Sequence, residues 1–197
     1  MPSLNSSKPS VVPRAGLTPE LVVNEAARLV DEVGRERLTL SELAKRLGVA
    51  QPSLYKHVDG LDGLNRLLAV RVLCEVGGTM RRASTGKAGE DAISALAAAY
   101  RTYALSHPGR YAYVVRAPAA DDAALEAAAA EILSIFDDVF AGYGITGSDA
   151  VDAARFVRST LHGFVSLELG GGFGLPHSAD ASFHRLVAAT NRALSDW

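Results

Sequence analysis

Apolar residues recur every three or four positions along most of this chain, and no stretch alternates between apolar and polar residues. The first pattern is typical of α-helices with one buried face, whereas alternation would indicate β-strands. The pattern therefore predicts an all-α fold of about nine helices. No segment approaches the roughly 18 uninterrupted apolar residues that a membrane-spanning helix needs, so no membrane partner is expected.

The first 76 residues are expected to hold four of these helices. Thr18 supplies an N-cap and Pro19 a first-turn proline for the first helix, which Gly34 ends. The other three are expected over 40–47, 51–58 and about 61–76, and the last of them is expected to end at Gly77 and Gly78. Residues 1–16, before the first helix, are polar, interrupted by prolines and without periodicity, so they predict a flexible arm.

Five more helices are expected in the remainder of the chain, beginning near Asp91, Pro108, Asp121, Ser148 and Ala179. Pro118 is expected to interrupt the second of them, and the glycine-rich run 170–174 is expected to be a loop. These breaks predict three parts: the flexible N-terminal arm 1–16, a small helical domain with a connecting helix over 17–76, and a larger helical domain over 77–197.

The segment after the first helix carries the signals of two short helices joined by a tight turn. Thr39 followed by Glu42 forms a capping box, which begins a helix by satisfying its free N–H groups. Gly48 stands where that helix would end in the left-handed conformation, which glycine adopts without steric cost. Pro52 suits the first turn of the second helix, and Leu54 supplies its inward face. This spacing is typical of a helix-turn-helix.

The outward positions of the second short helix carry side chains that suit DNA. Gln51 can bond an adenine edge through two atoms, Ser53 can bond several bases, and Pro52 can touch a thymine methyl group. The side chains that suit phosphate oxygens, which position a helix without reading sequence, are Tyr55, Lys56 and His57. An ordinary helical hairpin with a solvated outer face is the alternative. We favour DNA binding because the helix cap, the glycine turn and the polar outer face all indicate a DNA-reading helix-turn-helix.

The run 47–58 resembles the DNA-binding domain of the tetracycline-repressor (TetR) family of bacterial transcription factors, and the likeness extends upstream through 21–34 and downstream to about 76. The resemblance implies that bases face Gln51, Pro52 and Ser53, and that phosphates are held by Thr39, Tyr55 and His57. The full set of expected DNA-contacting residues is Thr39, Ala50, Gln51, Pro52, Ser53, Tyr55, Lys56 and His57. Ser41 and Leu61 replace basic residues of the family's best-known member, which implies a different operator.

The resemblance also implies a ligand-responsive regulator, most often a repressor, that binds a palindromic double-stranded DNA operator as a homodimer. In the family the last two helices of each subunit pair as a four-helix bundle, and the run 161–169 resembles one subgroup of this C-terminal domain. A dimer is also required mechanically, because one helix-turn-helix reads half a site. Gly163 favours close helix packing, since a mid-helix glycine otherwise costs about 1 kcal/mol.

An unknown small-molecule effector is expected to bind between the helices of the larger domain. Its expected contacts combine aromatic walls with two polar anchors: Tyr100, Tyr103, Phe136, Phe140, Arg158, His162 and Phe164. Each aromatic residue could instead be plain core, Arg158 could pair at the surface or the dimer interface, and His162 could pack between subunits. The sequence leaves these alternatives open.

Charge and composition agree with a DNA-binding end joined to an acidic body. The net charge is −2, but residues 1–82 hold twelve Lys/Arg against nine Asp/Glu, and residues 83–197 hold eight against thirteen. The acidic part would repel phosphates and keep DNA at one end. The single Cys74 excludes an intramolecular disulfide framework and fits a reducing cytoplasm, where we expect the protein.

No catalytic or metal-binding constellation is visible in the sequence. None of the five histidines has a partner at ligand spacing on one helical turn, no serine has the flanks of a nucleophile elbow, and no glycine-rich phosphate loop follows a strand. We therefore expect no catalysis and no cofactor. The alternative function is a helical protein-interaction module that keeps the helix-turn-helix as a scaffold without binding DNA.

Overall fold

The structure, a computed structural model, describes residues 16–114 and 122–197. Its elements in chain order, with η for a 3₁₀ helix, are α1 (Pro19–Val33), η1 (Arg35–Arg37), α2 (Leu40–Leu47), η2 (Gln51–Lys56), α3 (Gly60–Ser84), α4 (Gly89–Ser106), α5 (Pro108–Tyr111), α6 (Ala123–Phe140), η3 (Ala141–Tyr143), α7 (Ser148–Leu169) and α8 (Ala179–Ser195). Every regular element in these two ranges is a helix, so the predicted all-α class is confirmed. The α-helices together with η2 correspond to the expected helices. The predicted arm, apart from Gly16, and the break at Pro118 lie outside the described residues.

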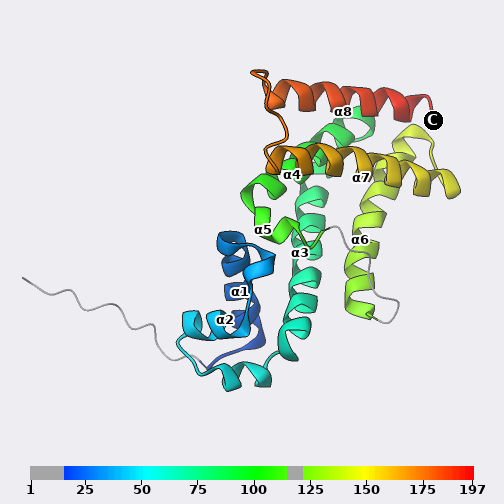
Figure 1. The fold of residues 1–197 in the computed structure, drawn as a ribbon. Coiled ribbons are helices and arrows are strands. Elements are labelled where there is room, and N and C mark those ends of the chain that lie inside the picture. The colour runs from blue at the N-terminus through cyan, green and yellow to red at the C-terminus, as the bar shows by residue number, and fades with distance from the viewer. Residues whose placement is uncertain (1–15, 115–121) are drawn as a thin grey trace, which may run out of the picture.

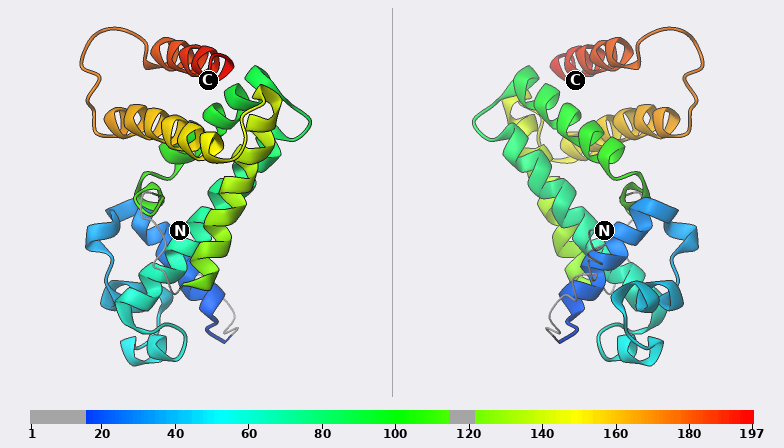
Figure 2. Two further views of the ribbon diagram at one scale, coloured as in Figure 1. Left: turned by 90° about the vertical axis from the view of Figure 1, so that its right-hand side faces the viewer. Right: turned by 90° about the vertical axis from the view of Figure 1, so that its left-hand side faces the viewer.

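One long helix connects the two ends of the molecule (Figure 1). α1, α2 and η2 lie at one end, α7 and α8 lie across the other, and α3 runs between them. α6 lies alongside α3, and α4 packs against α3, α7 and α8. The two turned views place η2 at the end of the molecule opposite α8 (Figure 2). In the part of the chain that the structure describes, no helix is long and apolar enough to span a membrane.

The N-terminal helices begin and end where their capping residues predict. The Thr18 hydroxyl accepts the Leu21 N–H at 3.2 Å, and the Thr39 hydroxyl accepts the Glu42 N–H at 3.2 Å. Each bond satisfies a backbone donor that the first turn of a helix leaves without a partner. Gly48 ends α2 with φ 67° and ψ 29°, the left-handed conformation expected there.

The third predicted helix differs from expectation in kind and in length. The sequence predicts a helix over 51–58, whereas the structure forms a 3₁₀ helix over Gln51–Lys56. The Ser53 N–H donates to the Ala50 carbonyl at 2.9 Å, and the His57 N–H donates to the Leu54 carbonyl at 2.8 Å. Tight turns of this kind occur in short segments, and this one has six residues.

The fourth helix is longer than expected. Gly77 and Gly78 predict an end near residue 76, but α3 continues through both to Ser84. A Cβ atom at Gly77 would lie 3.2 Å from Cγ1 of Ile132 on α6, so the glycine lets α6 approach closely. The packing of α4 and α6 against α3 therefore outweighs the propensity cost of about 1 kcal/mol for each glycine. The predicted division between domains at 76/77 falls inside this helix and stays a prediction.

Candidate nucleic-acid interface and effector cavity

η2 and its flanking residues Ala50 and His57 carry the predicted DNA-contacting side chains, apart from Thr39 at the start of α2, around a buried anchor. Leu54 is fully buried and Val58 nearly so, and both belong to the apolar core shared with α1 and α2. Around that anchor, the exposed residues of the predicted set are Thr39, Ala50, Gln51, Pro52, Tyr55 and Lys56, and the half-buried ones are Ser53 and His57. The ribbon views place η2, to which most of these residues belong, at one end of the molecule (Figure 2). A protruding polar segment held from beneath is the geometry with which a helix-turn-helix enters a DNA groove.

Salt bridges between α2 and α1 hold the two helices together and engage the side chain of Arg46. The Arg46 guanidinium donates to Glu32 at 2.6 Å and also pairs with Glu25. The hydrogen bond from Arg46 lowers the pKa of the Glu32 carboxyl below its ordinary value. Arg46 therefore positions the helix-turn-helix. Lys45 on the same helix has a side chain that is 80% exposed, and it adds a phosphate-suited residue that our sequence reasoning did not include.

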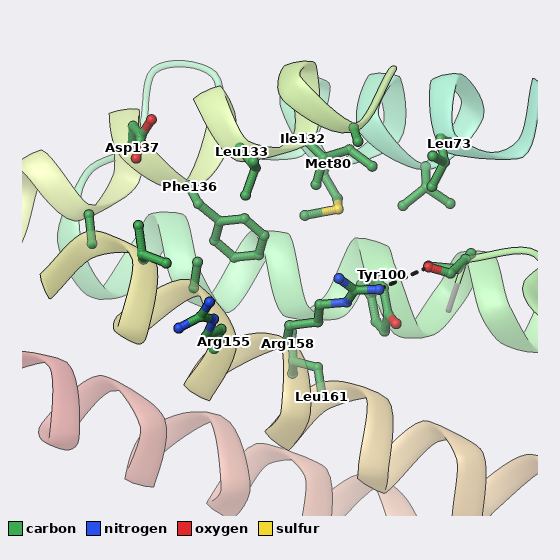
Figure 3. Close-up of a pocket in the computed structure, with 16 residues that line it drawn as sticks. Leu73, Met80, Tyr100, Ile132, Leu133, Phe136, Asp137, Arg155, Arg158 and Leu161 are labelled. Carbon is green, nitrogen blue, oxygen red and sulfur yellow. Dashed lines mark hydrogen bonds between the residues drawn. The ribbon is translucent and has the colours of Figure 1, made fainter. Parts of the chain in front are cut away.

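A cavity of about 430 Å³ lies in the body, between α3, α4, α6 and α7 (Figure 3). Small-molecule sites typically occupy about 300–1,000 Å³. Most of its lining is apolar and includes Leu73, Val76 and Met80 from α3 and Ile132, Leu133 and Phe136 from α6. Its polar lining residues are Tyr100, Asp137, Arg155 and Arg158. The cavity therefore has the size and the mixed lining of a site for a small organic molecule.

The structure brings together only part of the predicted effector set. Tyr100, Phe136 and Arg158 line the cavity, and His162 lines an adjoining hollow of about 340 Å³. The other three residues do not line either space. The Tyr103 hydroxyl donates to Glu75 at 2.8 Å, Phe140 is fully buried against Phe136, and Phe164 packs against Phe173 and Phe183. These three side chains pack in the core, which is the alternative that the sequence left open for the aromatic residues, and their contact with an effector stays a prediction.

A chain of hydrogen bonds leads from the cavity to α5. The hydroxyl groups of Tyr100 and Tyr111 lie 2.9 Å apart, and the Tyr111 hydroxyl lies 2.6 Å from Nδ1 of His162. Burial raises the pKa of Tyr100 above its ordinary value, so this phenol is neutral. Burial and the positive charge of Arg158 lower the pKa of His162, so its imidazole is neutral at pH 7. Tyr111 was not predicted as part of this site, since the bond that ties it to α7 joins it to His162, 51 residues further along the chain.

The contact between the N-terminal helices and the body is polar and close. The Arg110 guanidinium donates to Asp31 on α1 at 2.6 Å and to Glu75 on α3 at 2.9 Å. Burial tends to raise the pKa of Glu75, but the hydrogen bond from Tyr103 and the charge of Arg110 lower it overall. Gly109 lies directly against the backbone of α1. α5 therefore joins the cavity's hydrogen-bond chain to α1, the helix against which α2 packs.

The described side chains offer no site for a metal ion. In residues 16–114 and 122–197, no three His, Cys, Asp or Glu residues gather closely enough to hold one.

Two family models match this chain. The model described as "Bacterial regulatory proteins, tetR family" matches residues 22–60, and the model described as "Tetracyclin repressor-like, C-terminal domain" matches residues 93–190. The first range includes α2, η2 and most of α1, and the second includes the helices that line the cavity from α4 onward.

Known relatives match over most of their length. The chain is 39% identical over 175 residues to an uncharacterised HTH-type transcriptional regulator of Mycobacterium tuberculosis, covering 86% of this chain and 78% of the relative. It is 33% identical over 156 residues to the HTH-type transcriptional regulator YobS of Bacillus subtilis, covering 79% and 81%. The fold is similar to the crystal structure of TetR from Acinetobacter baumannii, with a TM-score of 0.69, 23% identity, and coverage of 92% of this chain and 98% of that one. The chain belongs to the TetR family of helix-turn-helix transcriptional regulators.

Proposed function

We propose that this regulator is a homodimeric repressor in which two η2 segments read the halves of a palindromic operator. The observation that carries the proposal is the exposed polar surface of η2 on the buried Leu54 side chain. In this proposal the bases are read by Gln51, Pro52 and Ser53, the phosphates are held by Thr39, Tyr55, Lys56 and His57, and Ala50 lies beside them.

Selection from a random-sequence DNA library tests the operator proposal. The full chain is expected to enrich a palindrome whose half-sites lie one helical turn apart, about 34–36 Å centre to centre. Its affinity for that palindrome should exceed its affinity for scrambled DNA by about a thousandfold or more, and the affinity should fall steeply with salt. Equal affinity for both DNAs would overturn the proposal and favour the protein-interaction module.

We also propose that an effector in the cavity releases the operator by favouring a conformation that does not bind DNA. Two contacts support this coupling. α3 lines the cavity with Leu73 and Val76 and begins at Gly60, just after η2. The chain from Tyr100 through Tyr111 reaches α5, where Arg110 pairs with α1. A ligand that prefers one arrangement of these helices changes operator affinity by its differential binding to the two states.

The homodimer is proposed to form through α7 and α8. Apolar surface remains exposed on and after α7, where Leu167 is 55% and Leu175 is 77% exposed. Gly163 is also exposed, and a Cβ atom there would meet none of the described residues within 4 Å. Contacts within residues 16–114 and 122–197 of one protomer therefore do not explain a glycine in the middle of α7. Close approach of a second copy would explain this glycine. In a two-fold dimer the same patch of α7 on both subunits would then meet at the interface.

Gly163→Leu is expected to weaken the dimer. A two-fold interface would contain the added side chain twice. Overpacking costs about 1–3 kcal/mol at each position, so the dimer dissociation constant should rise by at least about tenfold. Analytical ultracentrifugation measures this constant. Ala127→Leu on the exposed face of α6 is the matched control and should leave it unchanged. A dimer of undiminished strength in the Gly163 variant would place the interface elsewhere.

A further inference from the structure

The cavity has two walls of contrasting chemistry. On the side of α3 and α6, Figure 3 shows Met80, Leu133 and Phe136 directed into the space. On the side of α7, the same view shows the guanidinium groups of Arg155 and Arg158. The apolar wall favours hydrocarbon or aromatic surface, and the α7 wall favours an anion, because guanidinium forms two parallel hydrogen bonds to a carboxylate.

The polar wall continues into the adjoining hollow. This hollow shares Tyr100, Val114, Arg155 and Arg158 with the cavity and adds Ser159 and His162. The two arginines therefore lie where the apolar space meets a polar one. A ligand that spans this junction would have its polar group at the arginines and its apolar part between α3 and α6.

The charges of the lining residues favour a negative ligand group over a positive one. Arg155 and Arg158 are the cationic lining residues, and Asp137 is the acidic one. Arg155 also pairs at 3.2 Å with Asp152, which lies outside the lining; because both side chains are exposed this pair is weak, and a ligand carboxylate can compete for Arg155. Asp137 lies on α6, separated in Figure 3 from Arg158. The positive charge of Arg158 also acts on its surroundings, since it helps burial to lower the pKa of His162 and opposes the rise that burial causes in the pKa of Tyr111. A cationic ligand group at the junction would meet this same field and be repelled.

From these contacts we propose that the effector is an apolar monocarboxylic acid. Its carboxylate lies at Arg155 and Arg158, and its apolar body contacts Met80, Leu133 and Phe136. The inference rests on the proposed function in one respect, namely that this cavity is the effector site. Its own content is the chemical class of the ligand, which can be tested without DNA.

Titration calorimetry with three probes that share one alkyl chain tests the class. Decanoate is expected to bind the full chain at least about tenfold more tightly than decanol, because a hydrogen bond to a charged group replaces a neutral one. Decylamine is expected to bind most weakly. Each probe must be used below the concentration at which it forms micelles. Decanol or decylamine binding as tightly as decanoate would overturn the inference.

Matched variants locate the carboxylate. Arg155→Gln and Arg158→Gln are each expected to reduce the preference for decanoate over decanol by about tenfold, whereas Arg82→Gln, which removes the same charge from an exposed site on α3, should leave it unchanged. Arg158 also donates to the Val114 carbonyl at 3.3 Å, so the far-ultraviolet circular dichroism of its variant must match that of the parent. If it does not, Arg155→Gln and Arg158→Lys decide the question. An unchanged preference in folded Arg155 and Arg158 variants would overturn the inference.

The DNA experiment separates this inference from the proposed function. Preferred decanoate binding by a protein that selects no operator would support the ligand class and overturn the repressor. Operator binding by a protein that does not prefer decanoate would overturn the ligand class alone.

Discussion

Gly109→Ala is expected to lower the free energy of unfolding by about 3 kcal/mol, the upper part of the range for overpacking. A Cβ atom at this position would lie 2.0 Å from the Val30 carbonyl oxygen and 2.9 Å from the Cα atom of Asp31. Both are backbone atoms within α1, so neither can move aside as a flexible side chain would. α5 must instead shift away from α1. Urea unfolding followed by circular dichroism measures the change.

Gly174→Ala provides the control for Gly109→Ala. A Cβ atom at Gly174 would meet no atom of the described residues within 4 Å, so the free energy of unfolding should change by less than about 0.5 kcal/mol. Arg110→Ala separates steric contact from charge, because it removes the ion pairs with Asp31 and Glu75 without adding an atom beside α1. Equal stability of Gly109→Ala and the parent would contradict the close contact between α5 and α1.

Gln51→Ala is expected to relax base preference at one position of each half-site. The loss should be about 1–3 kcal/mol on the preferred operator, because a bidentate base contact is removed, and small on DNA that carries another base there. Fluorescence anisotropy titrations against operators that differ at single positions measure this pattern. The position at which the preference disappears identifies the base that Gln51 contacts.

Tyr55→Phe is expected to weaken binding to all sequences alike. The change removes one hydroxyl from a side chain that is 57% exposed and leaves the ring, so a phosphate contact is lost while the shape is kept. Lys56→Gln should weaken binding equally uniformly and also reduce the salt dependence by about one counterion, because it removes a charge. If Gln51→Ala also lowered affinity uniformly, our division between base-reading and phosphate-holding residues would be wrong.

Local signals made the N-terminal helices predictable. A threonine that caps a helix and a glycine that ends one act within three or four residues of their own position, and Thr39 and Gly48 do so here. The same is true of Leu54, whose inward position follows from the helical spacing of its neighbours. The exposed positions around Leu54 could therefore be predicted from the sequence, and their contact with DNA stays a prediction.

The cavity could not be predicted in this way, because it depends on which helices pack together. Tyr103 and Tyr100 lie on the same helix and have similar spacing to its apolar residues, yet one meets Glu75 and the other lines the cavity. Gly77 illustrates the same limit. Its sequence signal is a helix break, and its structural role is to admit Ile132 from a helix more than fifty residues away. Long-range packing overrides local propensity at both positions.

The unbroken course of α3 gives the molecule a lever arm. At 1.5 Å per residue, its 25 residues extend over about 37 Å, from just beyond η2 to the far side of the cavity. A tilt of about five degrees around its cavity end would swing the η2 end by about 3 Å. In a two-fold dimer both arms would swing, so the separation of the reading segments would change by up to about 6 Å against a half-site spacing of about 34–36 Å. A ligand-induced change too small to alter the packing of the body could thus put both halves of an operator out of reach.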